Sequence, residues 1–257
     1  MPATAAGAAL DFGPRYGLAT GVDFRMHYEP FVWSTGRRLV LFAHGSGGDA
    51  QQIAPSATSS DPGGVYKMCR ELVRRGYVVL SCTWASTTNF GNQAAIDAID
   101  ANLAALATPL GFSASRVAIV GYSMGFALAS NWARRNTAKI AALVGVAPLT
   151  NQDWWHGLGG TGATDQDGAY GGSWNTNGGN TFDPIDSIAA LAGIKRQLWT
   201  GSSDTTIPPG AVTGGVATYA AACAATDVDL HTVSGDHGTV WMNVDPVAVA
   251  DYIDAAW

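Results

Sequence analysis

A serine closely flanked by glycines is the residue of this chain whose surroundings best suit a nucleophile. Ser123 lies in the sequence Gly-Tyr-Ser-Met-Gly, between the apolar run 117–120 and the helix-like stretch 126–136. A strand, a sharp turn and a helix form the context in which such a motif exposes a serine hydroxyl above a sheet. Because the turn leaves no room for a Cβ, only glycine suits positions 121 and 125. The alternative interpretation is an ordinary turn in which the serine caps the helix.

A serine hydroxyl needs a base to become a nucleophile, and the base needs a group that orients it. Of the five histidines, His237 lies in Ser-Gly-Asp-His-Gly, a turn directly after the last apolar run. This position places His237 in an accessible loop at the end of a strand, and we predict that it is the base. His231 lies inside the same run, which indicates a structural role. Asp236 adjoins His237, but we expect its side chain to point away from the imidazole.

The predicted orienting acid is Asp204, in the loop after the apolar run 197–200. An aspartate in a loop rich in glycine and serine more often forms a local turn or a cap, but its position favours a role in chemistry here. Ser123, Asp204 and His237 each follow a different predicted strand, in the chain order Ser, Asp, His. Asp153, which follows the preceding strand, is a weaker candidate for the acid.

The negative oxygen of an acyl-transfer intermediate needs two hydrogen-bond donors that are already in place. The backbone N–H of Met124, directly after the serine, is one predicted donor. The other is expected in the glycine-rich segment His44–Gly48, with the N–H of Ser46 as first choice and that of Gly47 as alternative. We expect His44 to hold this loop by packing and hydrogen bonding. A turn without a chemical role stays open, but a phosphate-binding loop is excluded because the Gly-Lys-Ser/Thr ending is missing.

Apolar runs alternate with stretches of helical spacing along most of the chain. Buried strands that alternate with amphipathic helices predict an α/β fold with a mostly parallel sheet and helices on both faces. The predicted strands are an early one within 21–33, then 38–43, 77–82, 117–120, 140–146, 197–200 and 228–233. The predicted helices are 65–75, 93–106, 126–136, 185–191, 216–225 and 247–256.

Residues 150–182 interrupt this alternation, because they show no clear period and are rich in glycine, asparagine, aspartate and tryptophan. Structureless loops longer than about 15 residues are uncommon unless they are functional. We interpret the segment as an insertion over the carboxyl edge of the sheet, as a lid or a binding wall; a decorative loop is the alternative. Its Trp154, Trp155 and Trp174, together with Trp84, are predicted to bind substrate in an aromatic cleft suited to a sugar, a lipid or an aromatic acyl group.

The composition narrows the class of protein. The 257 residues are 47% hydrophobic and 13% charged, and this length suffices for one large domain spanning 1–257. A net charge of −6 and a pI near 5.2 argue against nucleic acid or an anionic membrane as partner. The few charges favour an extracellular or particle-borne protein, although Met1–Leu10 lacks the basic start of a signal peptide. No stretch reaches the ~18 apolar residues of a membrane span.

The three cysteines cannot all be paired with one another. Cys69 and Cys223 fall in predicted helices and Cys82 in a predicted strand, so we expect buried free thiols. No Cys-x-x-Cys or Cys/His spacing indicates a metal site. The sequence therefore predicts neither a metal nor a cofactor.

Four motifs in this order resemble the α/β-hydrolase superfamily: Ala43–Gly47, Gly121–Gly125, Gly201–Asp204 with Pro208, and Gly235–Gly238. The resemblance covers about 38–257 and implies a mostly parallel sheet, a Ser–Asp–His triad and a two-amide oxyanion hole. Within the superfamily the chain is most similar to compact esterases and to polyester-hydrolase or dienelactone-hydrolase-like members. The chain departs from the pattern at Phe126, where many relatives carry a second glycine, and in the insertion 150–182.

The resemblance implies a serine carboxylester hydrolase that forms an acyl-enzyme, with a small-molecule or polymeric ester of a lipid, glycan or polyester as substrate. The same machinery supports peptide cleavage, lactone opening or acyl transfer to an acceptor other than water. An alternative of another class is a non-catalytic, phage tail-like module that binds a cell envelope. Because every triad position is filled, we favour the enzyme.

Overall fold

The computed structural model describes residues 15–19, 22–27, 36–53 and 64–257. Of the early strand predicted within 21–33, residues 22–27 are a strand, and the remainder lies outside the described residues. The strands are β1 Arg15–Ala19, β2 Val22–His27, β3 Arg37–Ala43, β4 Val78–Cys82, β5 Phe112–Tyr122, β6 Ile140–Val146, β7 Lys195–Gly201 and β8 Val228–Val233. The helices are α1 Gly64–Arg74, α2 Gln93–Leu110, α3 Met124–Ala133, α4 Gln152–Gly157, α5 Gly160–Ala169, α6 Trp174–Asn177, α7 Gly179–Phe182, α8 Val216–Ala222 and α9 Pro246–Ala256.

The described strands form one sheet in the order β1-β2-β4-β3-β5-β6-β7-β8. Six of them, from β4 to β8 in this order, pair in parallel, whereas β1 and β2 join at one edge as antiparallel strands. The predicted mostly parallel sheet is therefore confirmed. Because parallel neighbours end at the same edge, the loops that follow β3, β5, β7 and β8 meet there.

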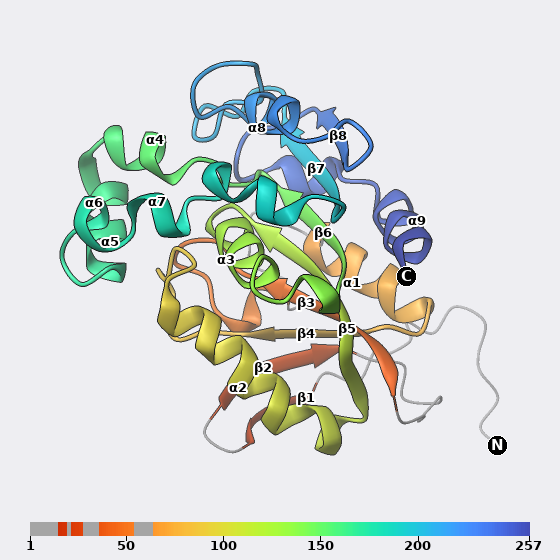
Figure 1. Cartoon of the computed structure of the whole chain (residues 1–257). Helices are drawn as coiled ribbons and strands as arrows, with labels where there is room; N and C mark the ends of the chain where they lie inside the picture. The colour runs from red at the N-terminus through yellow and green to blue at the C-terminus, as the bar shows by residue number, and fades with distance from the viewer. Residues whose placement is uncertain (1–14, 20–21, 28–35, 54–63) are drawn as a thin grey trace, which may run out of the picture.

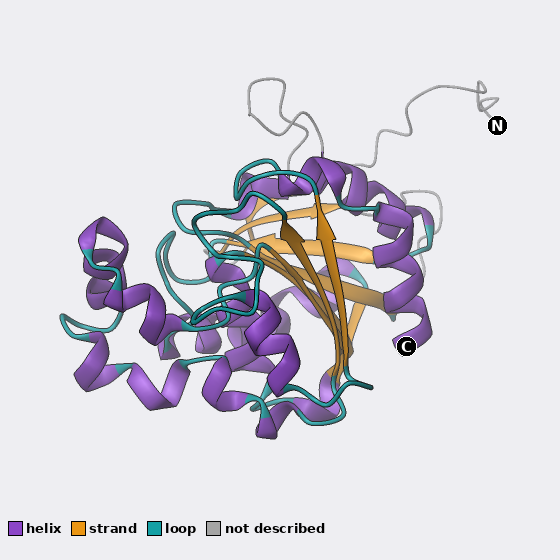
Figure 2. Cartoon of the chain, turned by 90° about the horizontal axis from the view of Figure 1, so that it is seen from above, coloured by secondary structure: helices purple, strands orange, loops and turns teal. Residues whose placement is uncertain are grey.

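Helices cover both faces of the sheet, as Figure 2 shows. Successive residues of β3 point to opposite faces and join different parts of the core. Leu39 and Leu41 pack in the cluster that includes α2, α3 and α8. Val40 and Phe42 pack in the cluster that includes α1 and α9. A strand covered on both faces must be apolar on both, which explains the continuous hydrophobic runs of β3, β4, β6 and residues 117–120 of β5.

Segment 150–182 is helical, which corrects the expectation of a stretch without secondary structure. It folds into α4, α5, α6 and α7, which gather at one side of the molecule (Figure 1). Two side chains begin these helices, because Asn151 accepts the N–H of Trp154 and Ser173 accepts the N–H of Thr176. The helix predicted over 185–191 is in fact two short 3₁₀ turns.

The three cysteines are free and buried, as the sequence predicts. Among the described residues, none of the helices has both the length and the apolar character of a bilayer-crossing segment.

Candidate active site

Ser123 occupies a strained turn between β5 and α3. Its φ of 51° and ψ of −119° lie outside the regions that residues with a side chain normally adopt. Backbone hydrogen bonds hold it there on both sides: its N–H donates to the carbonyl of Val146 at 3.0 Å, and its carbonyl accepts the N–H groups of Phe126 and Leu149, each at 3.0 Å. The surrounding strand ends thus offset a local conformational cost of about 1–3 kcal/mol.

Close packing explains both glycines of the motif. A Cβ on Gly121 would lie 2.6 Å from the backbone of Phe126, and a Cβ on Gly125 would lie 2.0 Å from the carbonyl oxygen of Ala43. The sequence-based expectation that the turn leaves no room for side chains is therefore confirmed. Phe126, the residue at which the chain departs from the motif, packs against Gly145 of β6. A Cβ on Gly145 would lie 2.8 Å from the Phe126 ring. The large side chain on α3 fits because the strand beneath it has a glycine at this position.

Ser123, His237 and Asp204 lie in one hydrogen-bonded chain. The Nε2 atom of His237 is 2.9 Å from the Oγ of Ser123, and its Nδ1 atom is 2.9 Å from Oδ2 of Asp204. Donation of the Nδ1–H to the carboxylate leaves the Nε2 lone pair directed at the serine hydroxyl. Three residues that lie far apart in the sequence thus have the geometry of a nucleophile, a base and an orienting acid.

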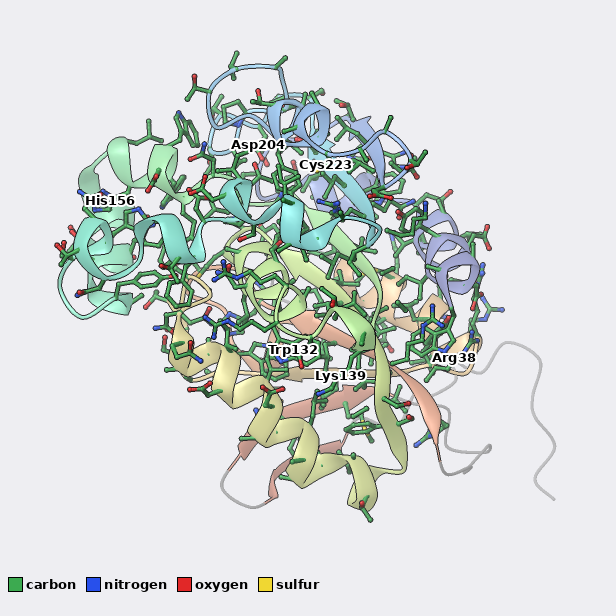
Figure 3. All side chains as sticks on the ribbon, in the orientation of Figure 1. Arg38, Trp132, Lys139, His156, Asp204 and Cys223 are labelled. Atoms are coloured by element: carbon green, nitrogen blue, oxygen red, sulfur yellow. The ribbon has the colours of Figure 1, made fainter. Side chains whose placement is uncertain are left out.

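Asp204 is fixed before any substrate binds. Its side chain is fully buried, and its second carboxylate oxygen accepts the N–H groups of Thr206 at 2.8 Å and Ile207 at 2.9 Å. The loop that carries it follows β7, near the top of the view in Figure 3. The start of this loop packs closely against the loop that carries His237. A Cβ on Gly201 would lie 2.4 Å from the carbonyl oxygen of Gly235.

The competing acids are engaged elsewhere. The carboxylate of Asp236 accepts the hydroxyl of Thr239 at 2.7 Å and its N–H at 2.9 Å, and these hydrogen bonds hold the pKa of Asp236 below its usual range. The side chain therefore turns away from the imidazole, as expected. Asp153 accepts the indole N–H of Trp174 at 2.6 Å, which leaves it bound within segment 150–182.

His231 has structural partners, as expected from its place within a strand. It contacts Asp229 at 2.7 Å, and its ring stacks on Trp199 at a centroid distance of 4.1 Å.

The loop after β3 is held by the completely buried His44. Its Nδ1 lies 2.9 Å from the carbonyl oxygen of Gly45, and its Nε2 lies 2.8 Å from that of Thr83. The N–H of Gly47 donates to Thr87 at 2.8 Å, so the alternative oxyanion donor is already occupied. The N–H of Ser46 has no acceptor among the described residues.

Ser46 and Met124 line the same small cavity as Ser123. Met124 is the first residue of α3, and the first N–H groups of a helix have no partner within it. The positive end of the helix dipole adds to the attraction for a negative oxygen at this point. The two residues whose backbone amides were predicted as donors thus both line the cavity that contains the serine.

Tyr122 supports the histidine from the position before the serine, and sequence reasoning missed it. Its hydroxyl donates to the backbone carbonyl of His237 at 3.0 Å, and its ring stacks against the imidazole with centroids 5.6 Å apart. Its ring also occupies the space where a Cβ on Gly45 would lie, at 2.7 Å. Tyr122 therefore contacts both the loop that carries His237 and the loop that carries Gly45. No sequence signal marks it beyond its place in the motif.

Two of the four tryptophans predicted to bind substrate belong to the hydrophobic core instead. Trp84 is 1% exposed and donates to the carbonyl of Phe42, and Trp174 is fully buried. Neither side chain lines the cavity that contains Ser123, so the structure does not support the prediction for these two. Trp154 is half-buried against the backbone of Gly214 and does not line the cavity beside the serine. Trp155 does line it.

The other lining residues are apolar and were not predicted. They are Phe90, Leu149 and Ile207, each almost completely buried. Leu149 and Ile207 follow β6 and β7, so their position after strand ends is the signal that could have identified them. Phe90 has a positive φ of 45°, and nothing in the sequence marks it.

Among the residues that the structure describes, one group of side chains has the spacing of metal ligands. Carboxylate oxygens of Asp153, Asp183 and Asp186 lie within 4.8 Å of one another. The Asp183 carboxylate is already occupied, because it accepts the N–H groups of Gln152 and Asp153 at 2.9 and 2.8 Å. Burial nevertheless raises the pKa of Asp183 to about 6. Hydrogen bonds thus engage two of the three carboxylates, Asp183 and Asp153.

No protein-family model matches the sequence, and a search of curated proteins finds no match. Solved structures do match. The 2,6-dihydroxy-pseudo-oxynicotine hydrolase is 13% identical over 93% of this chain and 66% of its own, with a TM-score of 0.66. The substrate-bound fluorophosphonate-binding serine hydrolase F of Staphylococcus aureus is 13% identical over 95% of this chain and 96% of its own, with a TM-score of 0.66. An S-formylglutathione hydrolase of Agrobacterium tumefaciens is 14% identical over 94% of this chain and 90% of its own, with a TM-score of 0.64. These likenesses show that the chain has the α/β-hydrolase fold.

Proposed function

We propose that this chain, built on the α/β-hydrolase fold, is a serine carboxylester hydrolase that forms an acyl-enzyme on Ser123. The observation that carries the proposal is the continuous hydrogen-bonded chain from the serine Oγ through His237 to Asp204, beside a cavity. The names of the matched structures, which include a fluorophosphonate-binding serine hydrolase and an S-formylglutathione hydrolase, support the same reaction class.

In the acylation step, the Oγ of Ser123 attacks the carbonyl carbon of the ester while its proton passes to Nε2 of His237. The carbonyl oxygen becomes negative and is stabilised by the backbone N–H groups of Met124 and Ser46. The strained backbone at the serine directs the hydroxyl toward this point. Collapse of the tetrahedral intermediate breaks the bond to the alcohol, which leaves with the proton from Nε2.

In the deacylation step, a water molecule gives a proton to Nε2 of His237 and attacks the acyl carbon. The second tetrahedral intermediate collapses, the serine recovers its proton from the imidazole, and the carboxylic acid leaves. Asp204 stays ionised throughout, because its role is to hold the imidazole in one tautomer and to stabilise the imidazolium. Its buried hydrogen bonds to Thr206 and Ile207 keep it in place for that role.

We assign segment 150–182 as an insertion within a single catalytic domain and as a wall of its site. The support is Trp155, which α4 places in the lining of the cavity that contains Ser123. Its neighbour Trp154 packs against Gly214, in the loop between β7 and α8. The insertion is thereby tied to the part of the chain that also carries the acid.

Reaction with a fluorophosphonate probe tests the proposal, because the probe modifies an activated serine. We expect one label per molecule, on the peptide that contains Ser123, and no label on Ser123→Ala. A non-catalytic binding module would take no label. A wild-type protein that stays unlabelled, or is labelled equally after Ser123→Ala, would contradict the proposed function.

A further inference from the structure

The cavity beside Ser123 is partly open to solvent, and the space inside it is very small. Its volume is about 20 Å³, which is close to the space that one water-sized sphere needs. A methyl group is of similar size. We infer that this protein takes esters of an acetyl-sized acid; the inference rests on the proposed ester hydrolase function and identifies its substrate class.

The position of the cavity assigns it to the acyl side of the ester. It contains the nucleophile Ser123 and both oxyanion residues, Ser46 and Met124, so the acyl carbonyl must sit at its edge. His237 does not line it. The alcohol has to leave on the side of the imidazole, from which it takes its proton, and the space away from the imidazole is left for the group attached to the acyl carbon.

The chemistry of the lining suits a small alkyl group. Apart from the serine and the oxyanion residues, the walls are Phe90, Leu149, Trp155 and Ile207, all of which are apolar. A methyl group in this space replaces water with van der Waals contacts on several sides. A longer chain would extend beyond these contacts or displace one of the walls.

Three of these walls have little freedom to move, because Phe90, Leu149 and Ile207 are at most 2% exposed in the core. Trp155 is half-buried on α4, and it is backed by α5. A Cβ on Gly162 would lie 2.8 Å from the Trp155 ring, so this helix lies directly against the indole. The ring nitrogen is buried and has no hydrogen-bond partner among the described residues, which indicates that shape holds it. Trp155 is therefore the specificity-determining wall that the insertion supplies.

The test compares kcat/KM for p-nitrophenyl acetate, butyrate and hexanoate. We expect the wild-type protein to favour acetate over hexanoate by at least about tenfold, since misfit of a few methylenes carries selectivity of this size. Trp155→Ala should reduce that preference at least about tenfold by raising hexanoate turnover. The control is Leu158→Ala, at the end of the same helix, whose side chain is 58% exposed and outside the cavity; it should keep the wild-type profile.

The outcomes separate this inference from the proposed function. Equal hydrolysis of acetate and hexanoate by the wild-type protein would overturn the acetyl-sized class and leave the esterase in place. Hydrolysis of no ester by either the wild-type protein or Trp155→Ala would overturn the proposed function itself. Should Trp155→Ala not fold, Leu149→Ala opens the same cavity from another wall. If a folded variant, Trp155→Ala or Leu149→Ala, keeps the wild-type preference for acetate, the side chain that it lacks does not set that preference. This result would overturn the role assigned to the cavity wall.

Discussion

The hydroxyl of Tyr122 donates a hydrogen bond to the backbone carbonyl of His237 at 3.0 Å, while the two rings stack. The residue next to Ser123 thus holds the loop that carries His237. Two neighbouring positions at one strand end therefore fix the distance between the serine and the imidazole. Tyr122 does not itself line the cavity, and it acts through the backbone and ring of His237, which makes it a positioning residue.

We expect Tyr122→Phe to lower kcat about three- to tenfold and to leave KM for p-nitrophenyl acetate nearly unchanged. The substitution keeps the ring stack and removes one hydrogen bond, which is worth about 0.5–1.5 kcal/mol. Tyr122→Ala should lose more, because it removes both contacts. An effect on thermal stability alone, with kcat as in the wild type, would contradict the positioning role.

Asp204→Asn should lower kcat about 10³- to 10⁴-fold. The Asn oxygen would accept the N–H groups of Thr206 and Ile207, and its NH₂ group would then face Nδ1 of His237. The imidazole would have to accept at Nδ1, which places its proton on Nε2, where the serine proton should go. Steady-state kinetics with p-nitrophenyl acetate measure the loss.

The matched control for this substitution is Asp236→Asn. Asp236 adjoins His237 in the sequence, but its carboxylate binds Thr239. We expect its kcat to stay within about threefold of the wild-type value. Equal losses in the two variants would mean that Asp204 is not the orienting acid.

Gly125→Ala should lower the free energy of unfolding by about 3 kcal/mol, because its Cβ would lie 2.0 Å from the carbonyl oxygen of Ala43 and force α3 away from β3. Gly168→Ala is the control, since nothing lies within 4 Å of a Cβ at this exposed position of α5. There alanine should stabilise by about 0.5–1 kcal/mol. Denaturant unfolding measures the free energy of unfolding of both variants. A Gly125→Ala variant as stable as the wild type would contradict the close packing of α3 against β3.

The core and the proposed catalytic residues could be predicted because one feature marks both. Ser123, Asp204 and His237 each follow a predicted strand. The ends of β5 and β7 are buried in the sheet, whereas β8 is a half-buried edge strand. The parallel pairing of the strands brings their ends to one edge. Residues distant in sequence could thus be placed together without any knowledge of their contacts.

The tryptophans and the insertion could not be predicted in the same way. Trp84 and Trp174 have polar partners for their N–H groups, the carbonyl of Phe42 and the carboxylate of Asp153, and no local pattern reveals such partners. The helices of 150–182 are short and rich in glycine, so their apolar period is weak. The caps at Asn151 and Ser173 are the local signals that could have indicated them.

The stability contributed by Asp183 should depend on pH. Burial raises its pKa in the folded chain from 3.8 to about 6, so the folded state binds more protons than the unfolded state between these values. Stability therefore falls as the pH rises from about 4 to about 6, by about 3 kcal/mol in total. The carboxylate of Asp153 lies nearby and adds to this effect.

Asp183→Asn should remove this dependence. Because other carboxyl groups titrate in the same range, the quantity to compare is the difference in unfolding free energy between wild type and variant at pH 4, 5, 6 and 7. We expect that difference to shift in favour of the variant as the pH rises and to level off above pH 6 or so. A difference that is constant with pH would contradict an elevated pKa.

The most direct test of the central claim is the turnover of p-nitrophenyl acetate by the wild-type protein and by Ser123→Ala at neutral pH. The substitution removes the nucleophile and leaves His237, Asp204 and the two backbone donors in place. We expect measurable wild-type turnover and a loss of at least about a thousandfold in kcat for the variant. Turnover by Ser123→Ala at the wild-type rate would contradict the assignment of this serine as the nucleophile.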